Sequence, residues 1–323
     1  MGYYLYLIMD LYNLKNKKLT QIDSTPFNLE KDIQKVVEEN TQELFNIDFV
    51  SSEFSLNDFR IDSLCYDEEN NSYVIIEYKK GKSYSVIDQG YSYLSLMLNN
   101  KSDFILEYNE NKKKNLKRDD VDWSSSRVIF LSPSFNFYQK NSVNFKDIPF
   151  ELWEIKRYTN NMISLNQHLP SSKESIQELE GTKDSVIKDV GKEIKVYTED
   201  DTFRRYKKLG NWNFDELYEE LKEKISDWEE IRFVPKRTYI GVWKKKKGKF
   251  YLGPRKNYIR VTVVRRVSYS GEVKKVKNKF SLDDPKKLFR EFNDKYRENY
   301  LYDLKDNKNL DYLVLMLKQK FDS

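Results

Sequence analysis

Two acids and a lysine occur at spacings that suit metal-assisted chemistry. Arg60-Ile61-Asp62 is followed by the apolar run 73–76, then by Glu77-Tyr78-Lys79, and further on by Gln89 and Tyr93. Carboxylates are the ligands that hard cations such as Mg²⁺ prefer, and an ammonium group neutralises charge that develops on a phosphate. These residue types, in this order, predict a site that holds a divalent cation against a phosphodiester.

The register of a predicted hairpin brings the two acids together. Residues 59–66 and 72–79 are apolar-rich segments separated by the polar, turn-forming cluster 67–71, so we expect an antiparallel hairpin. If Tyr66 pairs with Tyr73, Asp62 falls opposite Glu77, and their Cβ atoms lie about 5 Å apart. Side chains alternate along a strand, so Lys79 shares the face of Glu77, while Tyr78 between them points to the other face.

The expected pocket has two close carboxylates and one ammonium at its rim. The carboxylates repel each other, and Mg²⁺ or Mn²⁺ relieves the repulsion through oxygen ligands and retained waters. A bound cation polarises phosphoryl oxygens and lowers the pKa of a bound water. Lys79 is expected to orient that water or to neutralise charge on the phosphate.

The stretch resembles the PD-(D/E)XK nuclease superfamily, nearest to its RecB-like branch and to nucleases that cut mismatched or branched DNA. Asp62 matches the motif aspartate, Glu77 and Lys79 match E-x-K, and Gln89 with Tyr93 matches a Q-x-x-x-Y helix. The resemblance implies metal ligation by Asp62, Glu77 and the main-chain carbonyl of Tyr78, with Lys79 assisting the attacking water. It covers roughly residues 20–160. Ile61 stands where many members have proline.

Other residues near the motif have two interpretations each. Glu30 resembles an acid that the first helix of related nucleases donates, but the helix macrodipole alone also favours an acid there. Arg60 contacts phosphate or screens Asp62. Gln89 and Tyr93 are four residues apart, so they share one helix face. Gln89 is expected to reach the site and Tyr93 to pack the helix on the sheet. Lys80 is expected to contact nucleic acid.

Composition excludes several classes of site. The 323-residue chain has one cysteine, Cys65, which excludes an internal disulfide and a cysteine-rich zinc site. His168 is the only histidine, so a catalytic triad and a two-histidine metal site are excluded. The initial apolar run 3–9 is too short to span a bilayer and is expected to be a strand. We expect a cytoplasmic protein without a membrane partner.

Charge is distributed unevenly along the chain. The net charge is +5, yet residues 201–323 hold 32 Lys+Arg and 19 Asp+Glu. Residues 231–280 hold 17 basic residues and one acid, interleaved with aromatic residues. This pattern is typical of a nucleic-acid footprint or, equally, of a solvated lysine-rich strand face. The basic residues expected to bind nucleic acid here are Arg237, Lys244, Lys245, Arg255 and Arg260.

The apolar periodicity predicts two domains. We expect an α/β domain over residues 1–165, with a restriction-endonuclease-like mixed sheet flanked by helices. Residues 166–200, which are poor in large apolar side chains, are predicted to form a linker. A smaller basic α+β domain is expected over 201–323. It should include a helix capped by Asn213, three basic strands, a helix from Asp283 through Phe292, and a terminal helix over 312–321. This half resembles small domains of unknown function that follow nuclease-like domains.

Three functions follow. The first is a metal-dependent nuclease that hydrolyses phosphodiester bonds, with DNA as the preferred substrate and a homodimer as one arrangement for cutting two strands. The second is a catalytically inactive, nuclease-fold protein that binds nucleic acid or acts as an adaptor. The third is a protein-interaction module that uses exposed aromatic residues such as Trp212 and Trp228.

Overall fold

A computed structural model describes residues 10–79, 85–172, 174–176, 185–207, 215–268, 277–293 and 297–323. The chain divides into two compact units, residues 1–195 and 196–323. The predicted strand over 3–9, Lys80, Trp212 and Asn213 lie outside the described residues. Among the helices that are described, none is long and apolar enough to cross a membrane.

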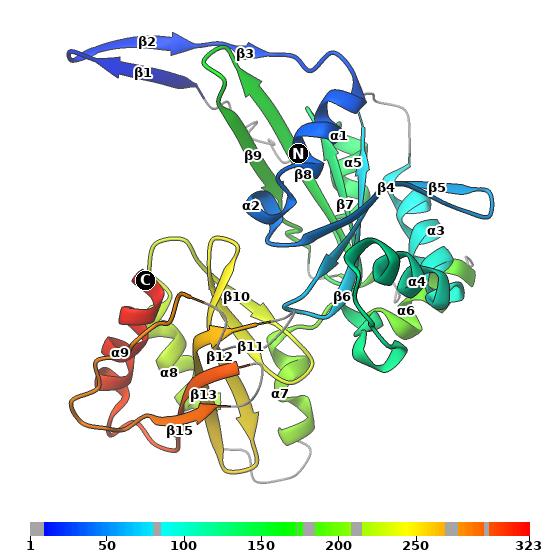
Figure 1. Ribbon diagram of the computed structural model, residues 1–323. Helices are drawn as coiled ribbons and strands as arrows, with labels where there is room; N and C mark the ends of the chain where they lie inside the picture. Colours follow the sequence, from blue (N-terminus) through cyan, green and yellow to red (C-terminus); the bar gives the residue numbers. More distant parts are fainter. Residues whose placement is uncertain are drawn as a thin grey trace. The chain divides into compact units, whose positions relative to one another are not determined.

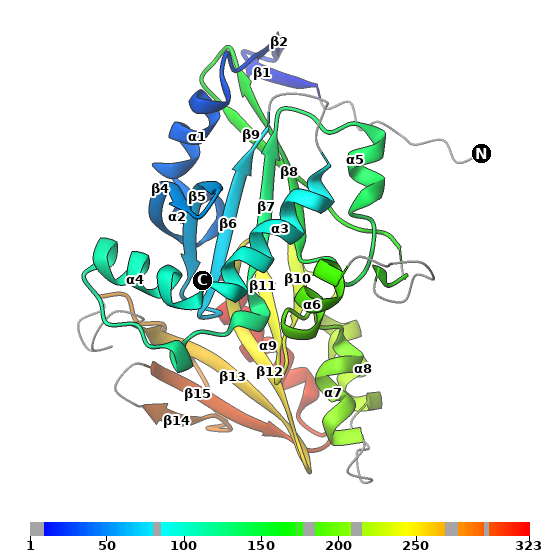
Figure 2. The same ribbon diagram turned by 90° about the vertical axis from the view of Figure 1, so that its right-hand side faces the viewer.

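The first unit is built on a seven-stranded mixed sheet (Figures 1 and 2). Its strand order is β3-β8-β7-β6-β5-β4, and β9 also pairs with β8. The central strands β6, β7 and β8 are parallel, and their neighbours are antiparallel. The strands are β3 (Ser24–Thr25), β4 (Asp48–Leu56), β5 (Phe59–Asp67), β6 (Ser72–Tyr78), β7 (Arg127–Ser132), β8 (Phe150–Tyr158) and β9 (Ile163–His168). The expected class, a mixed sheet flanked by helices, is confirmed.

Helices cover both faces of this sheet, so β6 is buried along its whole length. One face packs on α1 (Glu30–Glu38) and α2 (Thr41–Phe45) through a core that includes Ile33 and Val37. The other face packs on α3 (Val86–Asn99) and α4 (Lys101–Lys112) through a larger core. The remaining helical segments of this unit are the 3-10 turns η1 (Arg118–Asp120) and η2 (Trp123–Ser125), and the helices α5 (Phe137–Ser142) and α6 (Ser185–Glu193).

A ribbon of two strands extends from this unit ahead of β3 (Figure 1). Strand β1 (Leu11–Lys15) pairs antiparallel with β2 (Lys18–Ile22). This ribbon was not predicted from the sequence, because its alternation of apolar and polar residues is short and has no glycine at the turn.

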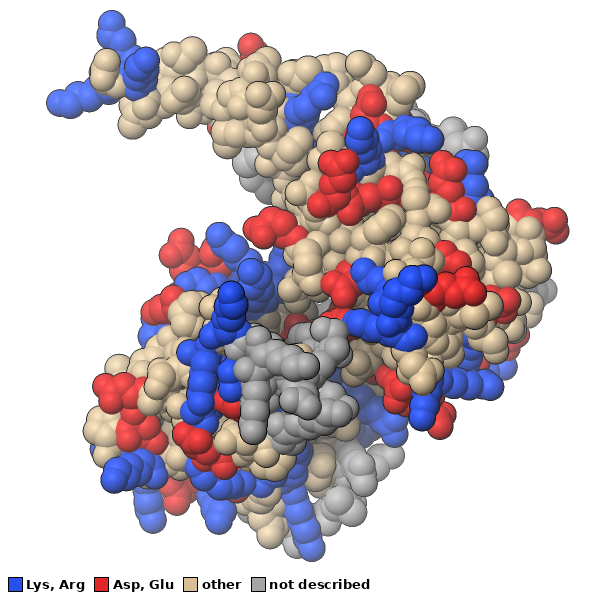
Figure 3. All heavy atoms as spheres, viewed as in Figure 1, with Lys and Arg blue, Asp and Glu red and all other residues tan. Residues whose placement is uncertain are grey.

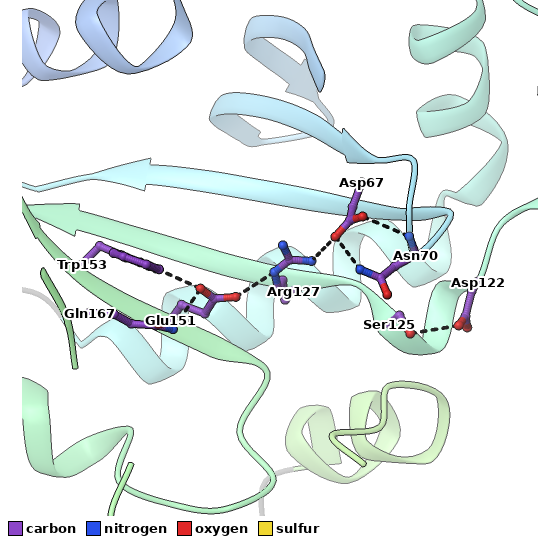
Figure 4. Close-up of polar contacts among 8 residues, drawn as sticks. All are labelled: Asp67, Asn70, Asp122, Ser125, Arg127, Glu151, Trp153 and Gln167. Atoms are coloured by element: carbon purple, nitrogen blue, oxygen red, sulfur yellow. Dashed lines mark hydrogen bonds and ion pairs between the residues drawn. The ribbon is translucent and has the colours of Figure 1, made fainter. Parts of the chain in front are cut away.

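A chain of polar contacts joins strand ends at one edge of the sheet (Figure 4). Arg127 Nη1 lies 2.9 Å from Asp67 Oδ2, and its Nε lies 2.7 Å from Glu151 Oε1. Asn70 donates to Asp67, while Trp153 donates to Glu151. Gln167 also donates to Glu151. A separate hydrogen bond in the same view joins Ser125 to Asp122. Arg127 therefore ties the end of β5 to the starts of β7 and β8.

The predicted linker over 166–200 is wrong. Residues up to His168 complete β9. Val190 of α6 and Ile194, directly after that helix, lie in the larger core of the first unit. The apolar residues of this segment are few, but they recur at helical spacing, which is sufficient to bury one face of a helix. The boundary between the units falls after Lys195.

The second unit is an antiparallel sheet with helices packed on one core. Its strand order is β10-β11-β12-β13-β15-β14, and the smaller α+β class is confirmed. The elements are α7 (Glu199–Lys207), α8 (Asp215–Ile225), β10 (Ile231–Pro235), β11 (Ile240–Lys244), β12 (Lys247–Arg255), β13 (Tyr258–Val267), β14 (Arg290–Asn293), β15 (Arg297–Leu304) and α9 (Leu310–Asp322). Trp228 packs against Phe321 in this core, as expected for an aromatic residue at helical spacing.

The predicted helix from Asp283 through Phe292 is wrong. The Asp284 carboxylate accepts hydrogen bonds from the Phe289 main chain and from the Tyr312 hydroxyl, which holds the segment as a turn. Residues 290–293 then pair with β15 as an edge strand. The apolar spacing of this segment suits a helix, but its tertiary partners favour a strand.

Candidate functional site

The site begins with the register of β5 and β6. Tyr66 pairs with Tyr73, and the antiparallel pairing continues to Ser63 opposite Ile76. The predicted pairing of Tyr66 with Tyr73 is confirmed. Asp62 and Glu77 follow the last paired residues, and their carboxylates lie close enough to interact. Glu77 projects toward α3, since its carboxylate accepts hydrogen bonds from Gln89 and Tyr93 of that helix.

Glu77 is held from three sides, and its residue is only 4% exposed. Its Oε1 accepts a hydrogen bond from Lys79 Nζ at 2.7 Å and another from Gln89 Nε2 at 2.7 Å. Its Oε2 accepts a hydrogen bond from the Tyr93 hydroxyl at 2.9 Å. The structure therefore brings Glu77, Lys79 and Gln89 together, and it adds the hydroxyl of Tyr93.

Asp62 is held by the main chain of the neighbouring strand. Its Oδ2 accepts a hydrogen bond from the Tyr78 N–H at 3.0 Å. Burial and the nearby Glu77 carboxylate raise the pKa of Asp62 from 3.8 to about 7, against the opposing effects of the Tyr78 N–H and Lys79. The two acids are close enough that a second negative charge is disfavoured at neutral pH.

Helix α3 lies close to the sheet, and this closeness lets its side chains reach Glu77. Ser85 caps the helix by accepting a hydrogen bond from the Asp88 N–H. Gly90 faces the Phe150 ring, where a Cβ atom would stand 2.6 Å from ring carbons. Only a residue without a side chain permits this approach. The neighbouring Gln89 is thereby placed at the carboxylate.

Tyr93 both packs and contacts the site. Its ring is buried and meets Phe59 edge to face, at 6.3 Å between ring centroids. Its hydroxyl contacts Glu77 and the Arg60 carbonyl oxygen. The prediction that Tyr93 serves packing was therefore incomplete. The signal was present, because a tyrosine four residues after Gln89 on the same helix face reaches the same carboxylate.

On the opposite face of the sheet, a second set of contacts holds the same strands. Gln34 of α1 donates to the Asp62 main-chain carbonyl at 3.1 Å. The Ser63 hydroxyl donates to Glu38 at 2.5 Å and lies 3.0 Å from the Tyr78 hydroxyl. Gln34, Glu38 and Ser63 were not predicted, since nothing in their spacing distinguishes them from ordinary polar residues of an amphipathic helix and a strand.

The remaining predicted residues of this unit lie near the same end of the sheet. Glu30 is the first residue of α1, one turn before Gln34, and α1 packs on the face opposite Glu77. Arg60 is exposed, two residues before Asp62 in β5. Their predicted roles, like that of Lys80, stay predictions.

Four of the five basic residues predicted to bind nucleic acid in the second unit contact other residues of that unit. Lys244 pairs with Asp322, Lys245 pairs with Glu230, and Arg260 pairs with Asp303 at 2.9 Å. Arg255 donates to the Pro254 carbonyl, and Arg237 lies exposed between β10 and β11. The aromatic residues Tyr239 and Tyr251 pack on each other. These contacts reduce the charge and ring surface that the strands offer to a ligand.

Comparisons with solved structures find two endonucleases. A repair endonuclease from Pyrococcus abyssi is 17% identical and aligns with 37% of this chain and 44% of its own, with a TM-score of 0.21. EndoMS in a complex with double-stranded DNA is 15% identical and aligns with 41% of this chain and 48% of its own, also with a TM-score of 0.21. Each alignment spans less than half of the endonuclease chain.

No model of a known protein family matches the chain. Among curated proteins, an uncharacterized protein of Haemophilus influenzae (strain ATCC 51907 / DSM 11121 / KW20 / Rd) is 44% identical over 234 residues. The alignment spans 72% of this chain and 76% of that protein. The chain belongs to the same family as this Haemophilus influenzae protein.

Proposed function

We propose that the first unit is a metal-dependent nuclease of the PD-(D/E)XK type that hydrolyses phosphodiester bonds in DNA. The observation that carries the proposal is the closeness of the Asp62 and Glu77 carboxylates just beyond the β5–β6 ladder, with Lys79 Nζ 2.7 Å from Glu77 Oε1. A buried carboxylate pair is costly unless a proton or a cation compensates its charge.

The residues present fit Mg²⁺ or Mn²⁺. In the part of the chain that the structure describes, no group of three or more His, Cys, Asp or Glu residues is placed to hold a metal. Asp62 and Glu77 suit a hard cation such as Mg²⁺, which commonly uses one or two carboxylates and keeps several waters. Asp62, Glu77 and the main-chain carbonyl of Tyr78 would hold the ion, which supplies polarisation of the phosphoryl group and a more acidic water.

The protein's own side chains divide the remaining work. Asp62 and Glu77 would bind the cation. Gln89 and Tyr93 fix the orientation of the Glu77 carboxylate through hydrogen bonds. Lys79 places an ammonium group beside Glu77, where it orients a water or neutralises charge on the phosphate. Glu30 is proposed to add an acid from the first turn of α1.

Purified protein incubated with linear, nicked, branched and mismatched DNA duplexes, with Mg²⁺ or Mn²⁺, tests the proposal. We expect cutting that stops in chelator and falls by roughly 100-fold or more in Glu77→Gln and Lys79→Met. Asp189→Asn and Lys192→Met are matched controls, because they alter an exposed ion pair of α6. Both controls should cut as the unaltered protein does.

Cutting that survives Glu77→Gln and Lys79→Met would place the active site elsewhere. Metal-independent DNA binding without any cutting would instead support the inactive, adaptor-like alternative.

A further inference from the structure

The β1–β2 ribbon carries no core of its own. All residues from Tyr12 to Gln21 are exposed, and only the residues at the base of the ribbon are half-buried. A two-residue turn joins the strands, with positive φ at Asn16 (52°) and Lys17 (62°), as the tight turns of hairpins require. A two-stranded hairpin is marginally stable alone in water, so its exposed surface is suited to contacts with a partner.

The two faces of the ribbon differ in chemistry. Leu14 pairs with Leu19 and Tyr12 pairs with Gln21, which places an apolar surface on one face. The other face carries Asn13, Lys15, Lys18 and Thr20, with Asn13 opposite Thr20 and Lys15 opposite Lys18. This polar face contains amide and hydroxyl groups near its middle and ammonium groups near its tip.

All charged residues of the ribbon are lysines. Residues 11–22 include Lys15, Lys17 and Lys18 and no acid. None of the three lysines forms an ion pair with any residue that the structure describes. In Figure 3, blue lysine atoms mark the end of the projecting arm. The contrast with Lys244, Lys245 and Arg260, which are paired within the second unit, identifies the ribbon as a source of free positive charge.

The ribbon starts at the end of the sheet that carries the candidate site. Strand β3, which follows β2, pairs with Arg157 and Tyr158 at the end of β8. Because β6, β7 and β8 are parallel, their paired residues place Lys79 level with Glu154 of β8. Tyr158 is four residues farther along, or about 13 Å. Figure 2 shows β6 and β7 pointing toward the end where β1 and β2 lie.

These dimensions match a groove of double-stranded nucleic acid. The major groove of B-DNA is about 12 Å wide and admits a two-stranded β-ribbon. Strands of five residues extend about 17 Å, or roughly half a helical turn of DNA. Asparagine and lysine side chains pair with the edges of bases, and lysines contact phosphates.

We propose that the β1–β2 ribbon is a DNA-binding arm that enters the major groove of duplex DNA beside the scissile phosphate. Its polar face meets the groove, and Lys15, Lys17 and Lys18 contact phosphates. This assignment rests on the proposed nuclease function for its substrate, and it specifies that the substrate is duplex next to the cut. The lysines are expected to supply much of the salt-dependent part of binding.

The test measures binding separately from cutting. Full-length Glu77→Gln protein in chelator is titrated with a duplex of about 25 base pairs and with a single strand of the same length, at about 50 to 200 mM salt. The triple variant Lys15→Gln, Lys17→Gln, Lys18→Gln is compared with the control Tyr12→Ser, Leu14→Ser, which alters the apolar face. Thermal melting of each variant establishes that the body of the protein is folded.

We expect the triple lysine variant to bind the duplex roughly tenfold or more weakly, with a log–log salt slope smaller by about 2 to 3. The apolar-face control should bind the duplex within about twofold of the parent. Unchanged duplex affinity in the lysine variant would overturn the proposal, and so would an equal loss for the single strand. A loss confined to the apolar-face control would also overturn it, since that result would place the DNA against the apolar face.

The outcome is independent of whether the carboxylate site is catalytic. If the unaltered protein never cuts but the lysine variant loses duplex binding, the nuclease proposal fails and the arm stands. If the protein cuts and the lysine variant binds normally, only the arm is overturned.

Discussion

At the scale of single residues, the Asp62–Glu77 pair is the feature that most resists a purely structural explanation. Glu77 receives hydrogen bonds from Lys79, Gln89 and Tyr93, yet Asp62 nearby keeps a pKa raised to about 7. A pair that served stability alone would not leave one acid so poorly compensated. Such sites commonly sacrifice stability for function.

The raised pKa of Asp62 makes the stability of the fold depend on pH in a definite direction. Its ordinary pKa is 3.8 and its folded pKa is about 7, so the folded protein binds more protons than the unfolded chain between those values. The side chain therefore contributes stability at low pH, and this contribution is lost as pH rises toward 7. Asp62→Asn removes this dependence.

We expect the melting temperature of Asp62→Asn, relative to the unaltered protein, to rise between pH 5 and pH 8 in chelator. At pH 8 Asp62→Asn should melt roughly 2 to 4 °C higher for each kcal/mol of repulsion relieved. Calorimetry at the two pH values, with Asp189→Asn as the control, measures the difference. Parallel melting curves for Asp62→Asn and the unaltered protein would show that Asp62 is not perturbed.

Tyr93 offers a test of orientation at a single hydroxyl. Tyr93→Phe keeps the ring contact with Phe59 and removes the hydrogen bond to Glu77. Loss of a hydrogen bond to a charged group, about 1.5 kcal/mol, predicts a cutting rate lower by roughly tenfold. Tyr312→Phe is the matched control, since it removes a tyrosine–carboxylate bond in the second unit. A Tyr93→Phe enzyme as fast as this control would limit Tyr93 to packing.

At the scale of elements, the sequence predicted the parts whose pattern is local. Strand β6 lies where the second strand of the hairpin was predicted, because its long apolar run leaves few alternatives. The β5–β6 register followed from alternation along two strands and a turn. From that register came the opposition of Asp62 and Glu77, which is the geometric basis of the site.

Elements that depend on distant partners were not predictable in this way. The edge strand β14 has the apolar spacing of a helix and becomes a strand through pairing with β15. Helix α6 lies in a polar segment and is held by the core of the first unit. The contacts of Gln34 and Ser63 arise only once α1 is packed on the sheet. Their residue types carry no motif.

Arg127 stabilises the edge of the sheet remote from the site, where it joins three strand ends. Its side chain is 21% exposed, and that of Asp67 is 4% exposed. Arg127→Met leaves the Asp67 and Glu151 carboxylates without their cationic partner, so we expect the free energy of unfolding to fall by about 3 kcal/mol. Urea denaturation measures this loss. Lys192→Met, at an exposed ion pair, should change stability by less than about 0.5 kcal/mol. Equal midpoints for the two variants would contradict this account of the edge.

At the scale of the whole molecule, the chain consists of two units with separate cores. Residues 196–323 contain a six-stranded sheet and a core that includes Leu221, Phe250, Val261 and Leu317. A domain of this size is large enough to fold alone.

We expect the fragment 196–323 to unfold cooperatively with a near-ultraviolet circular dichroism signal, because Trp228 packs in its core. The fragment 1–195 should retain the Asp62–Glu77 carboxylate pair and the β1–β2 ribbon. A fragment 196–323 without a cooperative transition would show that the second core depends on the first unit.

The central claim is that Asp62 and Glu77 bind one divalent cation beside Lys79. Anomalous scattering from a crystal soaked in Mn²⁺ tests it most directly. The account predicts one strong peak between the two carboxylates, absent in Glu77→Gln crystals treated in the same way. No peak at this position in a crystal that binds Mn²⁺ elsewhere would contradict the account.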